Sequence, residues 1–142
     1  MVDPANARKI TAGEPDRTSG PLRKRVHRLK RRRYRLPLPD QSGILYAHVT
    51  EITHLQSEGN YTTVHLFNGE RRMVCRSIGD LECCLSGRGF LRVHQSYLVN
   101  LRYVTEYLRE GGGKILLAGG GHAYLARSRK REFFAAMQDR SV

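Results

Sequence analysis

The stretch from residue 90 to residue 100, FLRVHQSYLVN, holds polar side chains between apolar neighbours. Arg92 carries hydrogen-bond donors, while Gln95 and Asn100 carry both donors and acceptors. Side chains of these types bind the base edges of duplex DNA, where an amide pairs with adenine and a guanidinium with guanine. The same groups also satisfy buried backbone atoms, and the residue types leave both interpretations open.

A second candidate group is the basic run RSRKR at residues 127–131. It directly precedes a predicted helix, whose free N–H groups and positive dipole end favour a phosphate. Arg127, Arg129 and Lys130 are therefore candidates for contacts to a nucleic acid. A guanidinium can bind guanine, whereas either basic side chain can hold a phosphate.

Catalytic and metal chemistry find little support. The six histidines are scattered, and none pairs with a cysteine at zinc-finger spacing. Cys83 and Cys84 point in different directions on a helix, so we interpret them and Cys75 as small packing residues with reduced thiols, as in a cytoplasm. No Ser, His and Asp set stands out as a triad. We expect no enzyme activity, no metal and no cofactor.

The charge points to a polyanionic partner. The 142 residues carry a formal net charge of +12, and residues 22–35 hold nine Lys or Arg. We expect residues 1–35 to form a disordered arm that contacts phosphates and adds affinity without sequence information. A solvated tail or linker is the alternative. No apolar run is long enough for a membrane span or a secretory signal, so we expect a cytoplasmic protein and no membrane partner.

Strand composition predominates after residue 43. Predicted strands alternate with turn residues; they lie at 44–48, 51–56, 61–67, 70–76, 90–101, 104–109, 115–118 and 122–126. Asn68-Gly69 separates two of these runs and predicts a hairpin with a type I′ turn. With only one helix between strands, a parallel sheet is not expected. The fold class is therefore mainly antiparallel β.

Two short helices complete the prediction. Ser77 begins a Ser-x-x-Asp cap before a helix that runs to Leu85, with Gly87 and Gly89 after its end. Ser128 is the predicted cap of a final helix. Its buried side would carry Phe133, Phe134 and Met137.

These segments resemble the LytTR family of bacterial DNA-binding domains. The family hallmark F-x-R-x-H-x-S-x-x-V-N is matched by Phe90, Arg92, His94, Ser96, Val99 and Asn100. EITHLQSEGNY at residues 51–61 is similar to the family's E-I-x-x-I-x-A-x-x-N-Y. Leu81-Glu82 matches the pair in its short helix, and residues 125–129 lie where V-S-R often precedes its last helix. The resemblance covers roughly residues 36–140.

The resemblance implies a LytTR-like fold of about ten short antiparallel strands in small sheets, with a short helix midway and a C-terminal helix. It also implies a sequence-specific transcription regulator that inserts loops into the major groove of double-stranded DNA, commonly at paired short repeats. The DNA-binding residues implied are Asn60, Arg92, Gln95, Arg127, Arg129 and Lys130. Because only the basic arm precedes this domain, we expect a stand-alone module without a receiver domain. A dimer on DNA and a separate signalling partner are both possible.

Several alternatives stay open. Asn60 is either a contact or a turn residue after Gly59, and His94 is either a contact or a structural histidine. Arg92 could pair with an acid inside the protein, and the choice between Arg127 and Arg129 as a base contact is unresolved because Ala126 replaces the usual Ser. The alternative function is a basic RNA-binding or ribosome-associated protein, although no RNP-type pair of aromatic residues is present.

Overall fold

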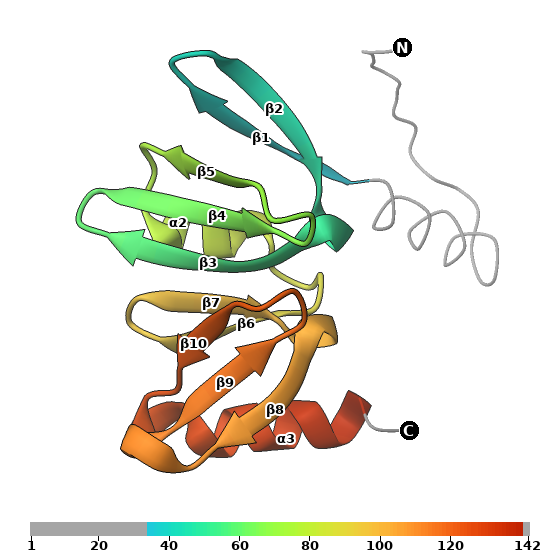
Figure 1. The fold of residues 1–142 in the computed structure, drawn as a ribbon, viewed down its shortest axis with the longest axis vertical. Coiled ribbons are helices and arrows are strands. Elements are labelled where there is room, and N and C mark those ends of the chain that lie inside the picture. Colours follow the sequence, from blue (N-terminus) through green and yellow to red (C-terminus); the bar gives the residue numbers. More distant parts are fainter. Residues whose placement is uncertain (1–33, 141–142) are drawn as a thin grey trace, which may run out of the picture. The chain divides into compact units, whose positions relative to one another are not determined.

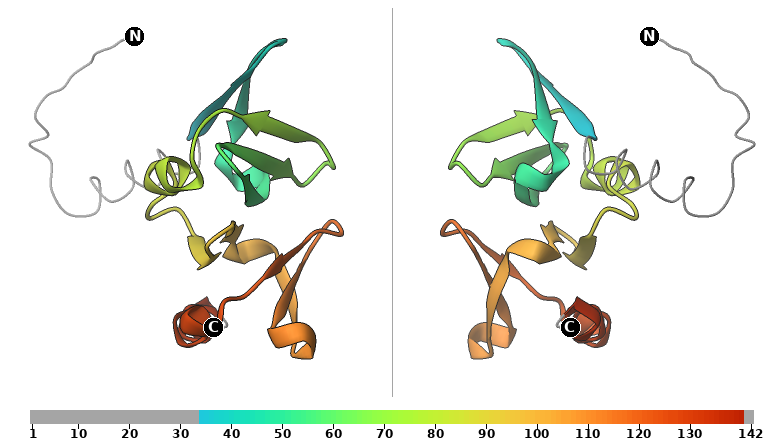
Figure 2. Two further views of the ribbon diagram at one scale, coloured as in Figure 1. Left: turned by 90° about the vertical axis from the view of Figure 1, so that its left-hand side faces the viewer. Right: turned by 90° about the vertical axis from the view of Figure 1, so that its right-hand side faces the viewer.

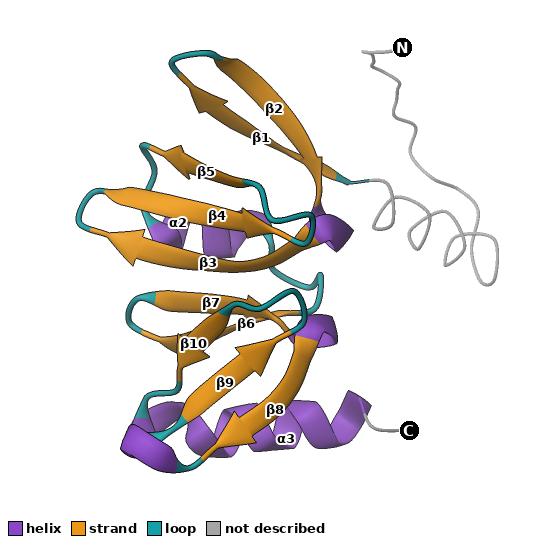
Figure 3. Ribbon diagram, in the orientation of Figure 1, coloured by secondary structure: helices purple, strands orange, loops and turns teal. Residues whose placement is uncertain are grey.

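A computed structural model of the chain describes residues 34–140. The predictions for residues 1–33, which include most of the basic arm, lie outside the described residues. Within these residues, ten strands form three small antiparallel sheets, joined by four 3-10 turns and two α-helices (Figures 1 and 3). The predicted fold class, mainly antiparallel β with one short and one C-terminal helix, is confirmed.

The first sheet is a two-stranded ribbon of β1 (Arg35–Asp40) and β2 (Gly43–His48). The sequence analysis did not predict β1, because Pro37 and Pro39 lie within it. Proline lacks an N–H and is confined to edge strands, and β1 is such an edge, since it pairs only with β2. At the turn, Asp40 Oδ1 accepts hydrogen bonds from the backbone N–H groups of Ser42 and Gly43. The 3-10 turn η1 (Val49–Glu51) follows.

The second sheet has five strands in the order β5-β4-β3-β7-β6. Its members are β3 (Ile52–Glu58), β4 (Tyr61–Leu66), β5 (Arg71–Val74), β6 (Phe90–His94) and β7 (Tyr97–Asn100). Thr62, Val64 and Leu66 alternate along β4 and are buried on one face of the strand, and Thr63 is buried on the other face. Figure 1 shows α2 behind this sheet, where the helix contacts β3 and β7. Its residues Ile78 and Leu81 are buried.

The predicted hairpin between β4 and β5 is present, but its turn type differs. The Gly69 N–H donates to the Leu66 carbonyl, so the turn is centred on Phe67-Asn68, and the Leu66 N–H donates to the Glu70 carbonyl. The loop thus has three residues, and Gly69 takes the positive φ of 93°. This pattern is typical of a type I turn with a glycine bulge, in place of the predicted type I′ turn.

The helix α2 (Ile78–Cys84) begins as predicted: the Ser77 side chain accepts from the Asp80 N–H at 3.0 Å. The chain leaves it through Leu85 and the positive-φ residues Gly87 and Gly89. The predicted single strand over residues 90–101 is wrong in one respect. It is a hairpin, with β6 and β7 joined by a turn at Gln95-Ser96, and the 3-10 turn η2 (Leu101–Tyr103) follows it.

The third sheet orders its strands β10-β9-β8, with β8 (Val104–Leu108), β9 (Lys114–Leu117) and β10 (His122–Tyr124). The turn η3 (Glu110–Gly112) joins β8 to β9. The turn η4 (Arg127–Arg129) leads into α3 (Lys130–Arg140), which lies along this sheet in Figure 1. Phe133 of α3 is buried in a core with Val93, Val99 and Ile115.

Two details of the last helix differ from the prediction. Ser128 lies inside η4 and does not cap α3, because the chain makes a 3-10 turn before the helix begins. Phe134 is 44% exposed instead of buried, and its ring meets the edge of Tyr107 at 5.0 Å between centroids. Phe133 is buried as predicted, and Met137 packs at the margin of the same core.

Candidate nucleic-acid interface

Three segments that are distant in sequence meet along one side of the domain. They are residues 57–61 at the β3–β4 turn, residues 95–96 at the β6–β7 turn, and residues 127–130 at η4 and the start of α3; we call them the contact segments. All three lie on the left-hand side in Figure 1, which faces the viewer in the left panel of Figure 2. Strand pairing brings them together, because β3 pairs with β7 and β7 with β6.

One backbone hydrogen bond joins two of these segments directly, and another holds the chain just before the third against β6. The Ser57 N–H donates to the Ser96 carbonyl at 2.8 Å and thereby links the first segment to the second. The Ala126 N–H donates to the Val93 carbonyl, also at 2.8 Å, and holds the chain before η4 against β6. The three contact segments are therefore neighbours on one side of the domain.

The first contact segment presents Asn60 to solvent. Gly59 takes φ +65°, a region that costs glycine little. The Asn60 side chain is exposed and makes no hydrogen bond to any described residue, so its amide is available to a partner. Glu58 is exposed close by, so the charge of this surface is not uniformly positive.

The second contact segment presents Gln95. Its side chain is exposed, and within residues 34–140 its amide group has no hydrogen-bond partner. The turn is held by His94, whose Nδ1 accepts from the Ser96 N–H at 3.0 Å. His94 thus has the structural role that the sequence left as one of two interpretations.

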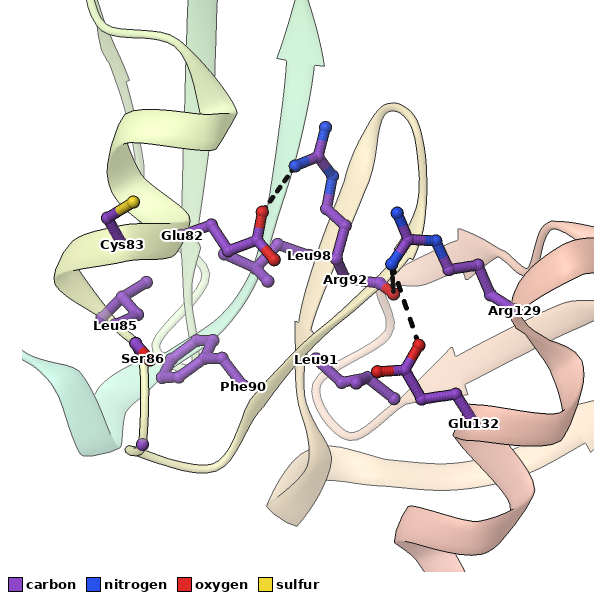
Figure 4. A pocket seen from close by; sticks show the side chains of 11 residues that line it. Glu82, Cys83, Leu85, Ser86, Phe90, Leu91, Arg92, Leu98, Arg129 and Glu132 are labelled. Atoms are coloured by element: carbon purple, nitrogen blue, oxygen red, sulfur yellow. Dashed lines mark hydrogen bonds and ion pairs between the residues drawn. The ribbon is translucent and has the colours of Figure 1, made fainter.

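Arg92 lies behind this turn and its guanidinium faces the protein (Figure 4). Nη1 contacts Glu82 Oε1 at 2.7 Å, Nε donates to the His94 carbonyl at 3.0 Å, and Nη2 donates to the Gln95 carbonyl at 2.7 Å. Its side chain is only 16% exposed. Arg92 therefore pairs with an acid inside the protein, Glu82, which was one of the two interpretations that the sequence left open.

The third contact segment is the most basic. Arg127 is exposed, and neither Arg127 nor Lys130 has a side-chain partner among the described residues. Arg129 is more constrained, because its Nη1 donates to the Arg92 carbonyl at 3.4 Å and lies 3.8 Å from Glu132 Oε1. The two arginines that the sequence could not separate thus differ in how free their guanidinium groups are.

A histidine pair in the five-stranded sheet consists of the buried His54 of β3 and the half-buried His65 of β4. The rings of His54 and His65 are stacked 4.1 Å apart, and His54 Nδ1 lies 2.9 Å from the Thr53 hydroxyl. Burial, together with His65 and His122, lowers the pKa of His54 to about 3. Burial and the positive charge of Arg71 also lower the pKa of His65. Both effects favour the neutral rings.

A shallow pocket lies between α2, β6 and the start of α3 (Figure 4). Its floor is apolar, formed by Leu85, Phe90, Leu91 and Leu98. Its rim carries the ion pairs of Arg92 with Glu82 and of Arg129 with Glu132. In the described part of the chain no group of three His, Cys, Asp or Glu residues is placed to hold a metal ion. Nor is any helix of residues 34–140 long and apolar enough to cross a membrane.

The family model of the LytTr DNA-binding domain matches residues 42–138, which is more than half of the chain. The chain belongs to this family. It is therefore a DNA-binding domain, and the geometry above describes a LytTr domain. A solved LytTr DNA-binding domain from Bacillus cereus has the same fold, with a TM-score of 0.65 and 16% identity over 74% of this chain and 97% of that one.

Two curated relatives match the LytTr region by sequence. The heme-containing CO-sensing transcriptional regulator RcoM 2 of Paraburkholderia xenovorans is 33% identical over 79 residues, 56% of this chain. The CO-responsive transcriptional regulator RcoM of Rhodospirillum rubrum is 33% identical over 82 residues, 57% of this chain. The matches span 29% and 31% of the relatives' own length.

The sequence-based prediction singled out residues in all three segments but missed one partner. Five of the six predicted residues lie in them (Asn60, Gln95, Arg127, Arg129 and Lys130), whereas Arg92 lies behind the second. Glu82, which binds Arg92, was noted only as part of a helix motif. The acid in the middle of α2 and the isolated arginine in the hallmark were a signal for this pair, but only the fold brings them together.

Proposed function

We propose that this LytTr domain is a sequence-specific transcription regulator that inserts its contact segments into the major groove of double-stranded DNA. The observation that carries the proposal is the convergence of three exposed segments whose Asn60, Gln95 and Arg127 side chains have unused hydrogen-bonding groups. Amide and guanidinium groups are the types that discriminate base pairs in the major groove. Family membership independently supports duplex DNA as the ligand.

The proposed roles differ along the surface. Asn60, Gln95 and Arg127 contact bases, while Lys130 and the basic residues of the 1–35 arm contact phosphates. We assign Arg129 to a phosphate, since its guanidinium also binds the Arg92 carbonyl and lies near Glu132. The arm and the domain at residues 36–140 then divide the work: the arm supplies affinity and the domain supplies specificity.

We further propose that the domain binds paired short repeats, with one copy of the chain on each repeat. A single domain presents one set of contact segments, so two copies would double the number of bases that are contacted. The relatives named above are transcriptional regulators, which supports the same role here.

Selection from a randomised duplex library tests the proposal. The full chain is incubated with the library at about 150 mM salt, where screening weakens loose electrostatic contacts. We expect recovery of a paired short motif. Binding without a motif, or preference for a single-stranded RNA library at the same salt, would contradict sequence-specific DNA binding and favour the RNA-binding alternative.

A further inference from the structure

The Arg92 guanidinium connects α2 to the turn between β6 and β7. It binds Glu82 on α2, the His94 carbonyl at the end of β6 and the Gln95 carbonyl in the second contact segment. The backbone carbonyl of Arg92 in turn accepts from Arg129 in the third segment. Figure 4 shows Glu82, Arg92 and Arg129 in a row along the pocket rim.

We propose that Glu82 and Arg92 form a positioning pair that sets the conformation of the Gln95 turn and so determines DNA specificity without touching a base. The inference rests on the proposed function, because it explains how the proposed base contact at Gln95 is held. Glu82 is thus a specificity-determining residue on a helix that lies outside the contact segments.

The geometry requires arginine at this place. Three different nitrogens of one planar group each meet a separate acceptor, two of them at 2.7 Å. One of the two short bonds is the charge-assisted pair of Arg92 with Glu82. In this pair the Arg92 side chain is mostly shielded from solvent. A lysine ammonium keeps the charge but cannot hold this fixed fork of acceptors.

The turn needs such support because its sequence provides little of its own. Gln95-Ser96 contains neither glycine nor proline, and its local hydrogen bond is the one from the Ser96 N–H to His94. Carbonyl groups of two successive residues point to Arg92, so the guanidinium fixes the two peptide planes that flank the Gln95 Cα. The direction of the Gln95 side chain follows from these planes.

Electrostatics and positioning make opposite predictions for Glu82. Removal of a carboxylate near the contact surface strengthens attraction to every duplex, because less negative charge opposes the phosphates. Loss of the positioning pair instead weakens binding only where the Gln95 turn must match a sequence. The ratio of the two dissociation constants, random duplex over selected duplex, separates these effects.

The test compares Glu82→Gln with Asp80→Asn in the full chain. Asp80 is an exposed acid on the same helix, and its carboxylate has no partner in the described residues. For Glu82→Gln we expect the ratio of dissociation constants to fall by about fivefold or more, with binding to random duplex unchanged or tighter. For Asp80→Asn the ratio should stay as in the wild type. Equal changes on both duplexes for Glu82→Gln would overturn the positioning role.

Arg92→Lys separates positioning from a phosphate contact. A phosphate contact would survive this change in large part, so specificity would remain. The positioning role predicts the same loss of discrimination as Glu82→Gln, together with changed NMR shifts of the Gln95 and Ser96 amides without DNA. Unaltered amide shifts and unaltered discrimination would overturn the inference. If the wild type itself shows no discrimination, the proposed function fails instead.

Discussion

The side chains of the contact surface divide into those with unused hydrogen-bonding groups and those already bound within the protein. Asn60, Gln95 and Arg127 belong to the first kind, and Arg92 to the second. Residue type alone could not make this distinction, because an arginine in a strand has the same donors whether it faces DNA or an acid. The acid lies ten residues earlier on a helix, and only tertiary packing places it at 2.7 Å.

Gln95→Ala should weaken binding to the selected duplex by about 1–3 kcal/mol, since one amide contact to a base is lost. Binding to random duplex should stay the same. Fluorescence anisotropy with both duplexes measures the two constants. Gln41→Ala, which removes an exposed amide from the β1–β2 turn, serves as the control. An equal loss on both duplexes would show that Gln95 does not discriminate bases.

The buried His54 gives the stability of the domain a pH dependence. Because its folded-state pKa of about 3 lies below the ordinary value of 6.5, the unfolded chain binds the proton first as the pH falls. The contribution of His54 to the free energy of unfolding should therefore be constant above pH 6.5. It should decrease below that pH by up to about 1.4 kcal/mol per unit until the pH reaches about 3.

Urea denaturation at a series of pH values measures this effect. His54→Gln removes the titrating ring, and its unfolding free energy should decrease less steeply between pH 6.5 and 4 than that of the wild type. Carboxylates titrate in both proteins and cancel in the comparison. Parallel curves for the two proteins would contradict the role of His54.

At the scale of elements, the sequence predicted the helix ends and turns that have characteristic capping or turn residues. The cap at Ser77, the glycines after α2 and the Asn68-Gly69 hairpin were all recognised from local chemistry. The β6–β7 hairpin was not, because Gln95-Ser96 has no turn-forming signature and its stability comes from Arg92 and His94. The strand β1 was missed because it contains two prolines, which are tolerated in edge strands but not in central ones. Whether a strand lies at an edge depends on the whole sheet and cannot be read from the local sequence.

Ser77→Ala should destabilise the domain by about 1 kcal/mol, since the Asp80 N–H loses its acceptor at the start of α2. Chemical denaturation followed by circular dichroism measures the change. Ser77→Asp retains an acceptor and places a negative charge at the helix N-terminus, so it should restore most of the loss. If Asp is as destabilising as Ala, the cap is not the reason for the serine.

At the scale of the whole molecule, the residue patterns predicted the types of element and the family resemblance their approximate number, but neither predicted the order of the strands. The pairing of β3 with β7 passes over β4, β5 and α2, and it is this pairing that brings Ser57 next to Ser96. Long-range pairing depends on which faces can be buried together, which a single sequence does not display. The family resemblance supplied the contact segments, and the fold explains why they are neighbours.

The basic arm should act through charge alone. Replacement of Arg31, Arg32 and Arg33 by Gln in the full chain should weaken binding to selected and random duplexes alike. The slope of log K against log salt should become shallower by up to about 3, because fewer counterions are released on binding when phosphate contacts are lost. Titrations between low and physiological salt measure the slope. An unchanged slope would mean that these arginines do not contact DNA.

The central claim is that the three contact segments form one DNA-binding surface. An NMR titration of the full, isotope-labelled chain with the selected duplex tests it most directly, because every backbone N–H reports on its own surroundings. We predict that the largest shift changes occur at residues 57–61, 95–96 and 127–130, with the same apparent affinity at all three. Largest changes at β2 and η2, with the contact segments unaffected, would contradict the account.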